Sequence, residues 1–291
     1  MTSASPSPIT FYYSADSDDA FMYWALRRKI IDTGPYSLHI KTGNTEDLNR
    51  SALSGEPDIC ALSIYAYGLI ADQYFLLPHS GSVGRNYGPV LVAKKPYTLG
   101  DLPNLVVASP GENTTAHCLL KLISPQTKTK VIPIVPFEKI LEAIDHGEVD
   151  AGLLIHEGLL MYSQFGLHLV CDVGKWWFQK TSLPLPLGGT VIKKALGKET
   201  ISFLSSCLRN SIKYSLDHPD KVLQHIMRED KRMTESLHDQ KLIRKYLSLY
   251  ANEDTLDYGE DGRKAIQAFL NLTYESGLLS KRVRVEFTPW F

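Results

Sequence analysis

One histidine stands out because of its place in the sequence. His156 directly follows residues 151–155, a small and apolar stretch typical of a buried strand, and precedes Glu157. A neutral imidazole at the open end of a strand can act as a general base near neutral pH, although a lone histidine is as often structural. Glu157 could orient it, but neighbours on a strand point to opposite faces. Position 160 is Leu, which excludes the HExxH zinc motif.

A second candidate site lies at the start of an expected helix. Asn113, Thr114 and Thr115 follow a Pro-Gly turn and precede an apolar segment with helical spacing. Free backbone N–H groups and the helix dipole favour a carboxylate or phosphate at such a position. The alternative interpretation is ordinary N-capping by Asn or Thr. Two adjacent threonines exceed what one cap requires, and the GK[ST] of a phosphate-binding loop is missing.

Three acidic residues, Asp16, Asp18 and Asp19, begin another expected helix. They could cap that helix and complement its dipole, which is the favoured interpretation for Asp18 and Asp19. They could also accept hydrogen bonds from sugar hydroxyl groups. A metal site is weakly supported because no cluster of further ligands is evident.

Two other features have simpler interpretations. Arg85 lies in the glycine-rich segment 79–88 and could bind an anion, but a solvated side chain on a surface connection is favoured. Trp176 and Trp177 are adjacent, and we expect one to pack in the core and the other to flank a cleft. No serine or cysteine lies in a GxSxG elbow, so covalent hydrolase chemistry lacks support.

The elements around these residues indicate how the residues could meet. Each polar stretch follows an expected strand, and ligands in open parallel sheets bind at the carboxyl ends of the strands. We therefore expect the polar stretches to line one crevice. The strands are residues 9–14, 57–63, 104–109 and 151–155, and the stretches that follow them are residues 14–19, 63–67, 109–115 and 156–158.

The alternation of strands and helices predicts an α/β protein with two lobes. A larger, discontinuous α/β lobe comprises residues 1–95 and 186–291, and its C-terminal part is mostly helical. A smaller inserted α/β lobe comprises residues 96–185, whose strands should form a parallel sheet with helical crossovers. The chain crosses between the lobes twice, and a cleft between lobes is an ordinary ligand site.

Further elements complete the expected lobes. The first lobe should contain two more short strands before the crossing, the second lobe one more, and the C-terminal part four helices and a final edge strand. The additional strands are expected at residues 74–78, 89–95, 131–136 and 282–287, and the helices at about 197–217, 218–228, 234–250 and 261–276.

The composition excludes several classes of protein. The chain has 291 residues, of which 44% are hydrophobic and 22% charged, as in ordinary globular proteins. The net charge of −1 comes from scattered charges, so no basic face for a nucleic acid is expected. No apolar run approaches the roughly 20 residues of a membrane-spanning helix, and the Ser/Pro-rich start is not typical of a secretory signal. We expect no nucleic-acid or membrane partner.

The four cysteines are far apart in the sequence and form no CxxC pair. Free thiols in a reducing compartment are the simplest interpretation, so we expect a cytoplasmic protein. They are Cys60, Cys118, Cys171 and Cys207.

Several longer segments resemble one enzyme family. The order of these segments is similar to that in the 1,4-dihydroxy-6-naphthoate synthases of the futalosine route to menaquinone, over residues from about 10 to 285. The most specific pieces are IHEG and LPLPLGG. The segments are DSDDAFMYWAL, ALSIYAY, YFLLPHSGSVGRNYGPVLVA, PGENTTAHCLL, GEVDAGLLIHEG and WWFQKTSLPLPLGG.

The resemblance implies a fold and an activity. The fold would be that of type II periplasmic solute-binding proteins, with a central cleft between two lobes. The activity would be a carbon–carbon lyase that converts cyclic dehypoxanthine futalosine, a carboxylate with a sugar-derived ring, into 1,4-dihydroxy-6-naphthoate and a sugar-derived fragment. Formation of an aromatic ring would drive the reaction, so no redox cofactor or metal is expected. The partner would be this small carboxylate, and no obligatory protein partner is implied.

The resemblance also implies roles for particular residues. The histidine of the family's IHEG motif, here His156, would be the general base. The end of the second strand motif, Ala61, Leu62 and Ser63, would hold substrate together with the paired threonines, Thr114 and Thr115, beside Asn113. The chain departs from many relatives at Ser14-Ala15, where they read Ser-Pro, and at Leu159-Leu160, which replaces a more polar pair.

Two other functions fit parts of the same pattern. Chorismate dehydratase, a sister enzyme of the same route, shares the fold but is expected to match the IHEG and LPLPLGG pieces poorly. A solute-binding protein without chemistry would also have two lobes, and the lack of an export signal argues against it.

Overall fold

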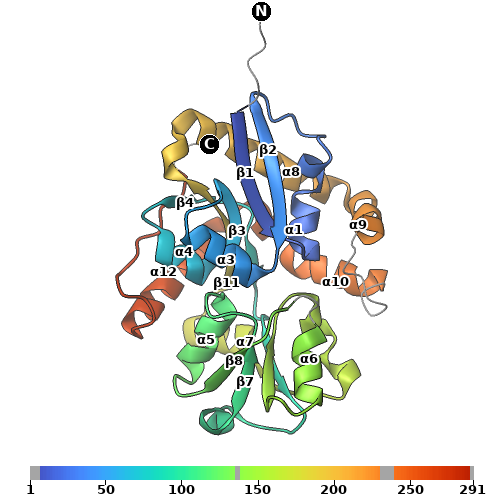
Figure 1. The fold of residues 1–291 in the computed structure, drawn as a ribbon, viewed down its shortest axis with the longest axis vertical. Coiled ribbons are helices and arrows are strands. Elements are labelled where there is room, and N and C mark those ends of the chain that lie inside the picture. The colour runs from blue at the N-terminus through green and yellow to red at the C-terminus, as the bar shows by residue number, and fades with distance from the viewer. Residues whose placement is uncertain (1–6, 135–137, 230–238, 289–291) are drawn as a thin grey trace, which may run out of the picture.

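The computed structural model describes residues 7–134, 138–229 and 239–288, which form two mixed sheets with helices packed around each (Figure 1). The larger lobe holds both described chain ends, and the smaller lobe lies beyond the carboxyl ends of its strands. The α/β architecture with two lobes that the sequence predicts is confirmed.

The sheet of the larger lobe has six strands in the order β2-β1-β3-β11-β4, with β5 also paired to β11. β1 is parallel to β2 and β3, whereas β11 is antiparallel to β3, β4 and β5. β3 is buried at every position, as its continuous apolar sequence predicts. The strands are β1 (Ser7–Ser14), β2 (Tyr36–Gly43), β3 (Ile59–Ser63), β4 (Tyr74–Leu76), β5 (Ser82–Gly84) and β11 (Leu185–Lys193).

The sheet of the smaller lobe has five strands in the order β10-β6-β9-β7-β8. β7, β8 and β9 are parallel, as expected for strands joined by helices, while β6 is antiparallel to both of its neighbours. The strands are β6 (Val90–Ala93), β7 (Val106–Ser109), β8 (Lys128–Val131), β9 (Ala151–Leu154) and β10 (His168–Asp172).

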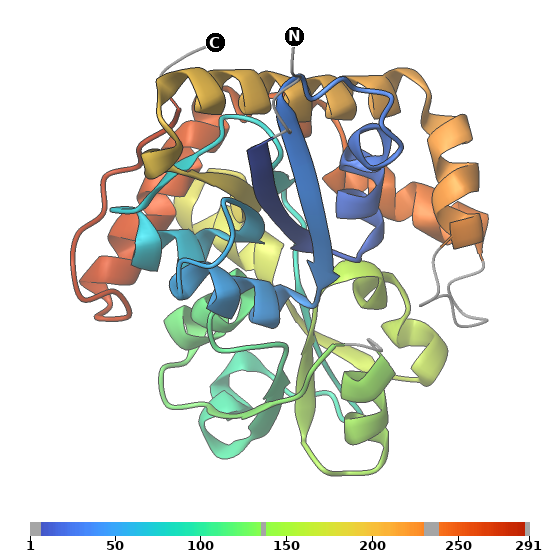
Figure 2. The same cartoon turned by 45° about the horizontal axis from the view of Figure 1, so that its top comes forward.

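Helices cover both sheets, and the long helix α8 runs across the top of the larger lobe (Figure 2). Short 3₁₀ helices connect several elements. The α-helices are α1 (Ser17–Met22), α2 (Trp24–Arg27), α3 (Thr45–Leu53), α4 (Ile64–Ile70), α5 (Thr115–Ile123), α6 (Glu138–Asp145), α7 (Val173–Thr181), α8 (Lys198–Asp217), α9 (Pro219–Glu229), α10 (Gln240–Tyr250), α11 (Glu253–Leu256) and α12 (Gly259–Glu275), and the 3₁₀ helices are η1 (Leu99–Asn104), η2 (His156–Leu160), η3 (Tyr162–Phe165) and η4 (Lys194–Leu196).

The two lobes share part of their core. One apolar cluster continues from β3 and β11 in the larger lobe to β6, β7 and α5 in the smaller lobe. Trp177 of α7 is fully buried in it, donates its indole N–H to the carbonyl of Pro184 and packs against Phe269 of α12. The first crossing segment also touches the start of α7 directly, because a Cβ on Gly174 would lie 2.0 Å from the carbonyl oxygen of Tyr87. The lobes therefore pivot, if they move, about a packed junction.

One predicted boundary differs from the structure. The sequence assigns residues 1–95 to the larger lobe, but β6 pairs with β9 and β10 in the smaller sheet. The chain thus crosses before residue 90, because the buried apolar run 90–93 lies between two strands of the second sheet. The return at residue 186 agrees with β11, which begins at Leu185. The description of the two lobes as separate domains stays a prediction.

Other expectations need correction. The strand expected at 131–136 lies at Lys128–Val131, since Pro133 has no N–H with which to continue the ladder, and residues 135–136 lie outside the described part. The edge strand expected at 282–287 is reduced to one bridge between Leu76 and Phe287. The helix expected at 234–250 corresponds to α10, which begins at Gln240, and residues 234–238 lie outside the described ranges.

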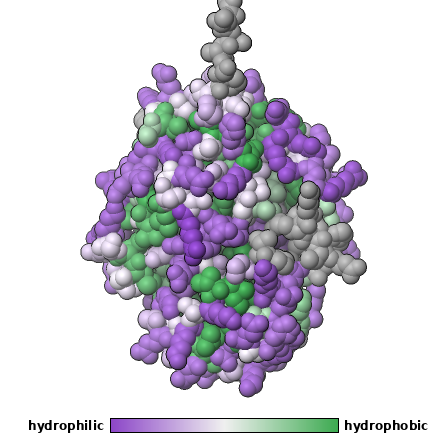
Figure 3. All heavy atoms as spheres, viewed as in Figure 1, coloured by the Kyte–Doolittle hydropathy of each residue, from purple (hydrophilic) through white to green (hydrophobic). Residues whose placement is uncertain are grey.

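The surface drawn in Figure 3 is mostly hydrophilic, with apolar atoms in separate patches on both lobes. Within the described ranges, no helix is both long enough and apolar enough to cross a membrane.

Candidate active site

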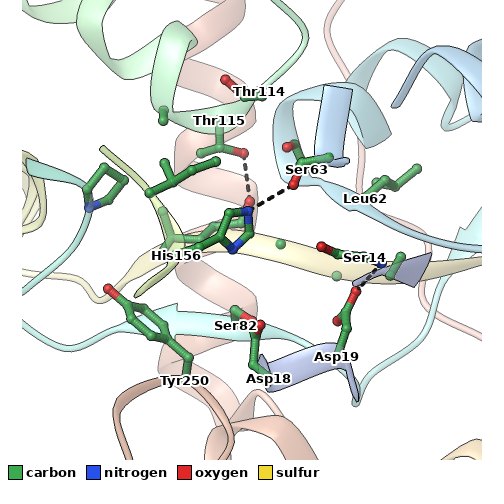
Figure 4. Close-up of a pocket in the computed structure, with 18 of the residues that line it drawn as sticks. Ser14, Asp18, Asp19, Leu62, Ser63, Ser82, Thr114, Thr115, His156 and Tyr250 are labelled. Carbon is green, nitrogen blue, oxygen red and sulfur yellow. Dashed lines mark hydrogen bonds between the residues drawn. The ribbon is translucent and has the colours of Figure 1, made fainter. Parts of the chain in front are cut away.

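A cavity of about 750 Å³, counted out to its mouth, lies between the two lobes. Its walls come from both sheets, at the carboxyl ends of β1, β3 and β9 and at the start of α5, which is the convergence that the sequence predicts. Figure 4 shows the cavity with the His156 ring inside it. The walls comprise Ser14, Asp18, Asp19, Thr45, Leu48, Ala61, Leu62, Ser63, Ser80, Ser82, Pro89, Thr114, Thr115, Ala116, Ile155, His156, Leu159, Leu187, Gly188, Gly189, Tyr246 and Tyr250.

His156 is held by groups from the larger lobe. The residue begins the 3₁₀ helix η2 in a left-handed backbone conformation with φ of 54°, which is uncommon for a residue with a side chain. Its Nε2 lies 3.0 Å from Oδ2 of Asp16 and 3.0 Å from Oγ1 of Thr45. Its Nδ1 lies 3.4 Å from the hydroxyl of Tyr246 on α10. A carboxylate on Nε2 requires an N–H there, so in the neutral ring Nδ1 is the basic atom.

These neighbours change the protonation of His156. Burial lowers the pKa of the imidazole, but the charge of Asp16 and its hydrogen bond, with the charges of Asp18 and Glu157, raise the pKa from 6.5 to about 9. The ring is therefore an imidazolium at neutral pH in the ligand-free protein. The sequence favours a neutral imidazole here, and the acidic surroundings correct that expectation.

Two further carboxyl groups lie in the cavity wall. Asp18 accepts a hydrogen bond of 3.0 Å from the hydroxyl of Ser82, and burial raises its pKa to about 6 although His156 lowers it. Asp19 accepts the backbone N–H of Ser14 at 2.7 Å, and burial together with the charge of Asp18 raises its pKa well above the usual value. Both residues are more than nine-tenths buried, so they do more than cap α1.

Glu157 does not orient His156. Its Oε1 accepts the backbone N–H of Ser17 at 3.0 Å and also the hydroxyl of Ser17, across the cleft. Glu157 is almost fully buried and caps the start of α1 from the opposite lobe. The side chains of the two neighbours in η2 thus point to different partners, and the carboxylate that contacts His156 is that of Asp16 instead.

The other end of the cavity is the start of α5. Thr114 is the N-cap: its hydroxyl accepts the N–H of His117 and donates to the carbonyl of Gly111 at 2.7 Å. The hydroxyl of Thr115 donates to the carbonyl of Leu187 at 2.7 Å and accepts the N–H of Tyr65. Both hydroxyls are thus engaged with the backbone, and the N–H groups of the first helical residues, Thr115 and Ala116, are the donors left for an anion.

Asn113 lies behind this end rather than in the cavity wall. Its backbone N–H and its side-chain amide both donate to the carboxylate of Glu46 on α3, at 2.9 and 2.7 Å. Its carbonyl accepts the amide of Asn49, whose oxygen accepts the N–H of Ser63 at 3.0 Å. Asn113 therefore joins the lobes and fixes the position of the α5 start, and its predicted contact with substrate stays untested.

The three residues at the end of β3 all line the cavity. Ala61 and Leu62 contribute an apolar wall, and Ser63 is the N-cap of α4. The hydroxyl of Ser63 accepts the amide of Asn49 at 3.2 Å. Its own proton remains available to a ligand.

Arg85 and Trp176 lie outside the cavity wall. The guanidinium of Arg85 is paired with Asp254 and Asp261 on the surface, as the favoured interpretation predicts. Trp177 is the core residue of the tryptophan pair, whereas Trp176 is partly exposed beneath Lys180.

The sequence analysis missed several wall residues. Thr45 begins α3 and contacts His156, and Tyr246 and Tyr250 lie one turn apart on α10. A pair of tyrosines at i and i+4 on one amphipathic helix is a usable signal, but it indicates core packing as readily as a site. In the described part of the chain, no group of three or more His, Cys, Asp or Glu side chains is arranged to hold a metal ion.

A family model described as menaquinone biosynthesis matches residues 10–275 of the chain. Among curated proteins, the chain is 34% identical to a 1,4-dihydroxy-6-naphthoate synthase of Thermus thermophilus, over 94% of this chain and 97% of that one. It is 32% identical to the synthase of Streptomyces coelicolor, over 92% of this chain and 93% of that one.

Solved structures agree on the fold. A protein from Archaeoglobus fulgidus is 34% identical with a TM-score of 0.86, and the match covers 93% of this chain and 98% of that one. The alkanesulfonate-binding protein SsuA of Xanthomonas axonopodis, at 14% identity, has a TM-score of 0.68 over 97% of both chains. The periplasmic-binding-protein-like fold that the resemblance implies is thus confirmed.

Proposed function

The chain belongs to the menaquinone-biosynthesis family, and on that premise we propose that it is an enzyme converting cyclic dehypoxanthine futalosine to 1,4-dihydroxy-6-naphthoate. The reaction class would be carbon–carbon lysis, with release of a sugar-derived fragment. The single observation that carries the proposal is a cavity between the lobes with a histidine at one end and a helix start suited to an anion at the other.

The chemistry needs two things from the protein, a site for the carboxylate and a base. The substrate carboxylate would accept the N–H groups of Thr115 and Ala116 and the hydroxyl proton of Ser63. His156 would remove a proton at Nδ1, and the electrons released would break the carbon–carbon bond as the second ring becomes aromatic. The fragment that leaves would take up a proton in exchange, so the step needs no other reactant.

The acidic residues would serve the sugar-derived part. Asp18 and Ser82 lie in the wall below His156, on the side away from Thr114 (Figure 4). A carboxylate with a serine beside it is a good acceptor and donor pair for vicinal hydroxyl groups. The apolar wall of Ala61, Leu62 and Leu159 would cover the faces of the ring.

A binding protein without chemistry is less well supported, because a His–Asp pair and two buried carboxylic acids are costly to maintain where only binding is needed. Chorismate dehydration remains a rival since chorismate is also a carboxylate. The four free cysteines support a cytoplasmic location, which we propose alongside the activity.

The proposal is tested by incubating the purified protein separately with cyclic dehypoxanthine futalosine and with chorismate. We expect 1,4-dihydroxy-6-naphthoate from the first and no dehydration of the second, measured by liquid chromatography and mass spectrometry. Turnover of chorismate but not of cyclic dehypoxanthine futalosine would indicate a chorismate dehydratase. Binding of either compound without any product would indicate a solute-binding protein.

A further inference from the structure

His156 and its partners come from opposite lobes. The histidine follows β9 in the smaller lobe, whereas Asp16 and Thr45 follow β1 and β2 in the larger lobe. The next residue of each segment also takes part, because the backbone N–H of Ser17 donates to the carboxylate of Glu157. Residues 16 and 17 thus face residues 156 and 157 as two consecutive contacts across the cleft.

The surroundings of Asp16 hold its carboxylate against the imidazole of His156. Its side chain is 8% exposed and that of His156 is 15% exposed, so the pair is largely shielded from water. The hydroxyl of Ser14 donates to the same carboxylate oxygen, Oδ2, that contacts His156. Asp16 is also the N-cap residue of α1, but its side chain makes no capping hydrogen bond there. The same carboxylate oxygen thus contacts both the serine that fixes it and the imidazole that it can orient.

We propose that Asp16 is the positioning residue of His156 and that the larger lobe presents it, so that the base is complete only when the lobes meet. This rests on the proposed function of His156. Asp16 holds the Nε2–H, which directs Nδ1 into the cavity toward Tyr246 and the substrate. The pair thus forms where the two lobes meet, and the base depends on that contact between them.

Other charged or titratable groups also face the ring and must be separated from Asp16 in any test. They come from α1, η2 and α10. These groups are Asp18, Asp19, Glu157 and Tyr246.

The first experiment is an NMR titration of the full-length protein labelled at its histidines. The His156 signal is identified by its loss in His156→Asn. In wild type we expect a midpoint well above 6.5, and in Asp16→Asn a midpoint lower by about one unit or more, the usual effect of one adjacent charge. Asp16→Asn keeps a good N-cap residue, and Asp16→Ser gives the same test should the first variant fold poorly.

A matched control is Ser14→Ala, which removes the hydrogen bond to Asp16 but keeps the carboxylate beside His156. We expect its midpoint to stay within about half a unit of wild type. A second control, Asp18→Asn, removes a charge that does not contact the ring and should lower the midpoint less than Asp16→Asn does. If Asp16→Asn and Asp16→Ser both titrate like wild type, Asp16 is merely a neighbour and the inference is wrong.

The second experiment measures kcat/KM against pH with cyclic dehypoxanthine futalosine. In Asp16→Asn, the pH at the midpoint of the rise in kcat/KM should be lower than in wild type by the same number of pH units as the NMR midpoint. If Asp16 were merely structural, the substitution would lower the maximal kcat/KM and leave the midpoint pH unchanged. Absence of turnover in wild type would overturn the proposed function, yet the NMR comparison would still decide whether Asp16 positions His156.

Discussion

The two ends of the cavity differ in the chemical groups that line them. Around His156, the carboxyl groups of Asp16, Asp18, Asp19 and Glu157 are all buried and all lie at one end. Around the start of α5, the groups that face the cavity are uncharged hydroxyls and backbone N–H groups. The carboxylate of Glu46 is near that end too, but it is turned away and saturated by Asn113 and Arg50.

This difference orients an anionic substrate before any specific contact forms. The dipole and the N–H groups of α5 attract a substrate carboxylate to that end, while the positive charge of His156 at the opposite end is already paired with the charge of Asp16. The charges of Asp16, Asp18 and Glu157 raise the proton affinity of His156, so the acidic end tunes the base while the α5 end sets the direction of the substrate.

The largest effect should come from removing the base. His156→Asn retains a polar side chain but cannot accept a proton near neutral pH. We expect kcat to fall roughly 100-fold or more, the usual worth of a general base. Affinity for 1,4-dihydroxy-6-naphthoate, measured by calorimetry, should change much less, because the carboxylate is held at the far end. Near-normal turnover would make His156 structural and would move the search for the base to Asp18.

A smaller effect is expected at the α5 end. Ala116→Pro removes one N–H from the first helical turn, where proline is tolerated. A hydrogen bond to a charged group is worth about 1.5–3 kcal/mol, so the product should bind about tenfold or more weakly. The matched control is Glu199→Pro, at the second residue of α8 and exposed, far from the cavity.

Equal affinity in Ala116→Pro and Glu199→Pro would place the anion elsewhere. This pair replaces the more obvious substitution of Thr114 and Thr115 by Val. Those two hydroxyls already bind backbone carbonyls, so their loss would disturb the helix cap and the contact with Leu187 as well as any ligand.

The smallest effect should come from Arg85. Its guanidinium is half exposed and paired with Asp254 and Asp261, so Arg85→Ala should change product affinity less than about twofold. Calorimetry on this variant provides the comparison with Ala116→Pro. A tenfold loss of affinity would mean that a charged side chain, and not the helix start, attracts the substrate.

The sequence predicts the ends of strands well and the contacts across the cleft poorly. The positions of Ser63, Thr114 and His156 follow from local patterns, because short apolar runs are bounded by polar and turn residues. The partnership of Asp16 with His156 joins residues 140 positions apart and depends on how two lobes meet, which no local pattern encodes. Glu157 is an example: its place next to His156 in the sequence suggests that it orients the histidine, but in the structure its carboxylate binds Ser17.

The sequence also fails to predict that the sheet of the smaller lobe is mixed, because its antiparallel pairing has no clear local pattern. The sequence indicates parallel β7, β8 and β9 because helices intervene between them. β10 is a short strand with partly exposed residues and no clear apolar alternation, so the sequence gives little sign of it. It pairs with β6 at the edge of the smaller sheet, a contact that only the folded structure defines. Assigning β6 to the wrong lobe follows from that omission.

The dependence of kcat/KM on pH tests the central claim most directly. A base works only when it is unprotonated, and the surroundings of His156 raise its pKa from 6.5 toward about 9. In wild type, kcat/KM for cyclic dehypoxanthine futalosine should therefore rise with pH and level off only above an ionisation well beyond 6.5, and His156→Asn should lose this rise from its residual rate. A profile that is flat from pH 6 to 9, or that falls as pH increases through this range, would contradict the account, because the imidazolium would then be the working form or His156 would not take the proton.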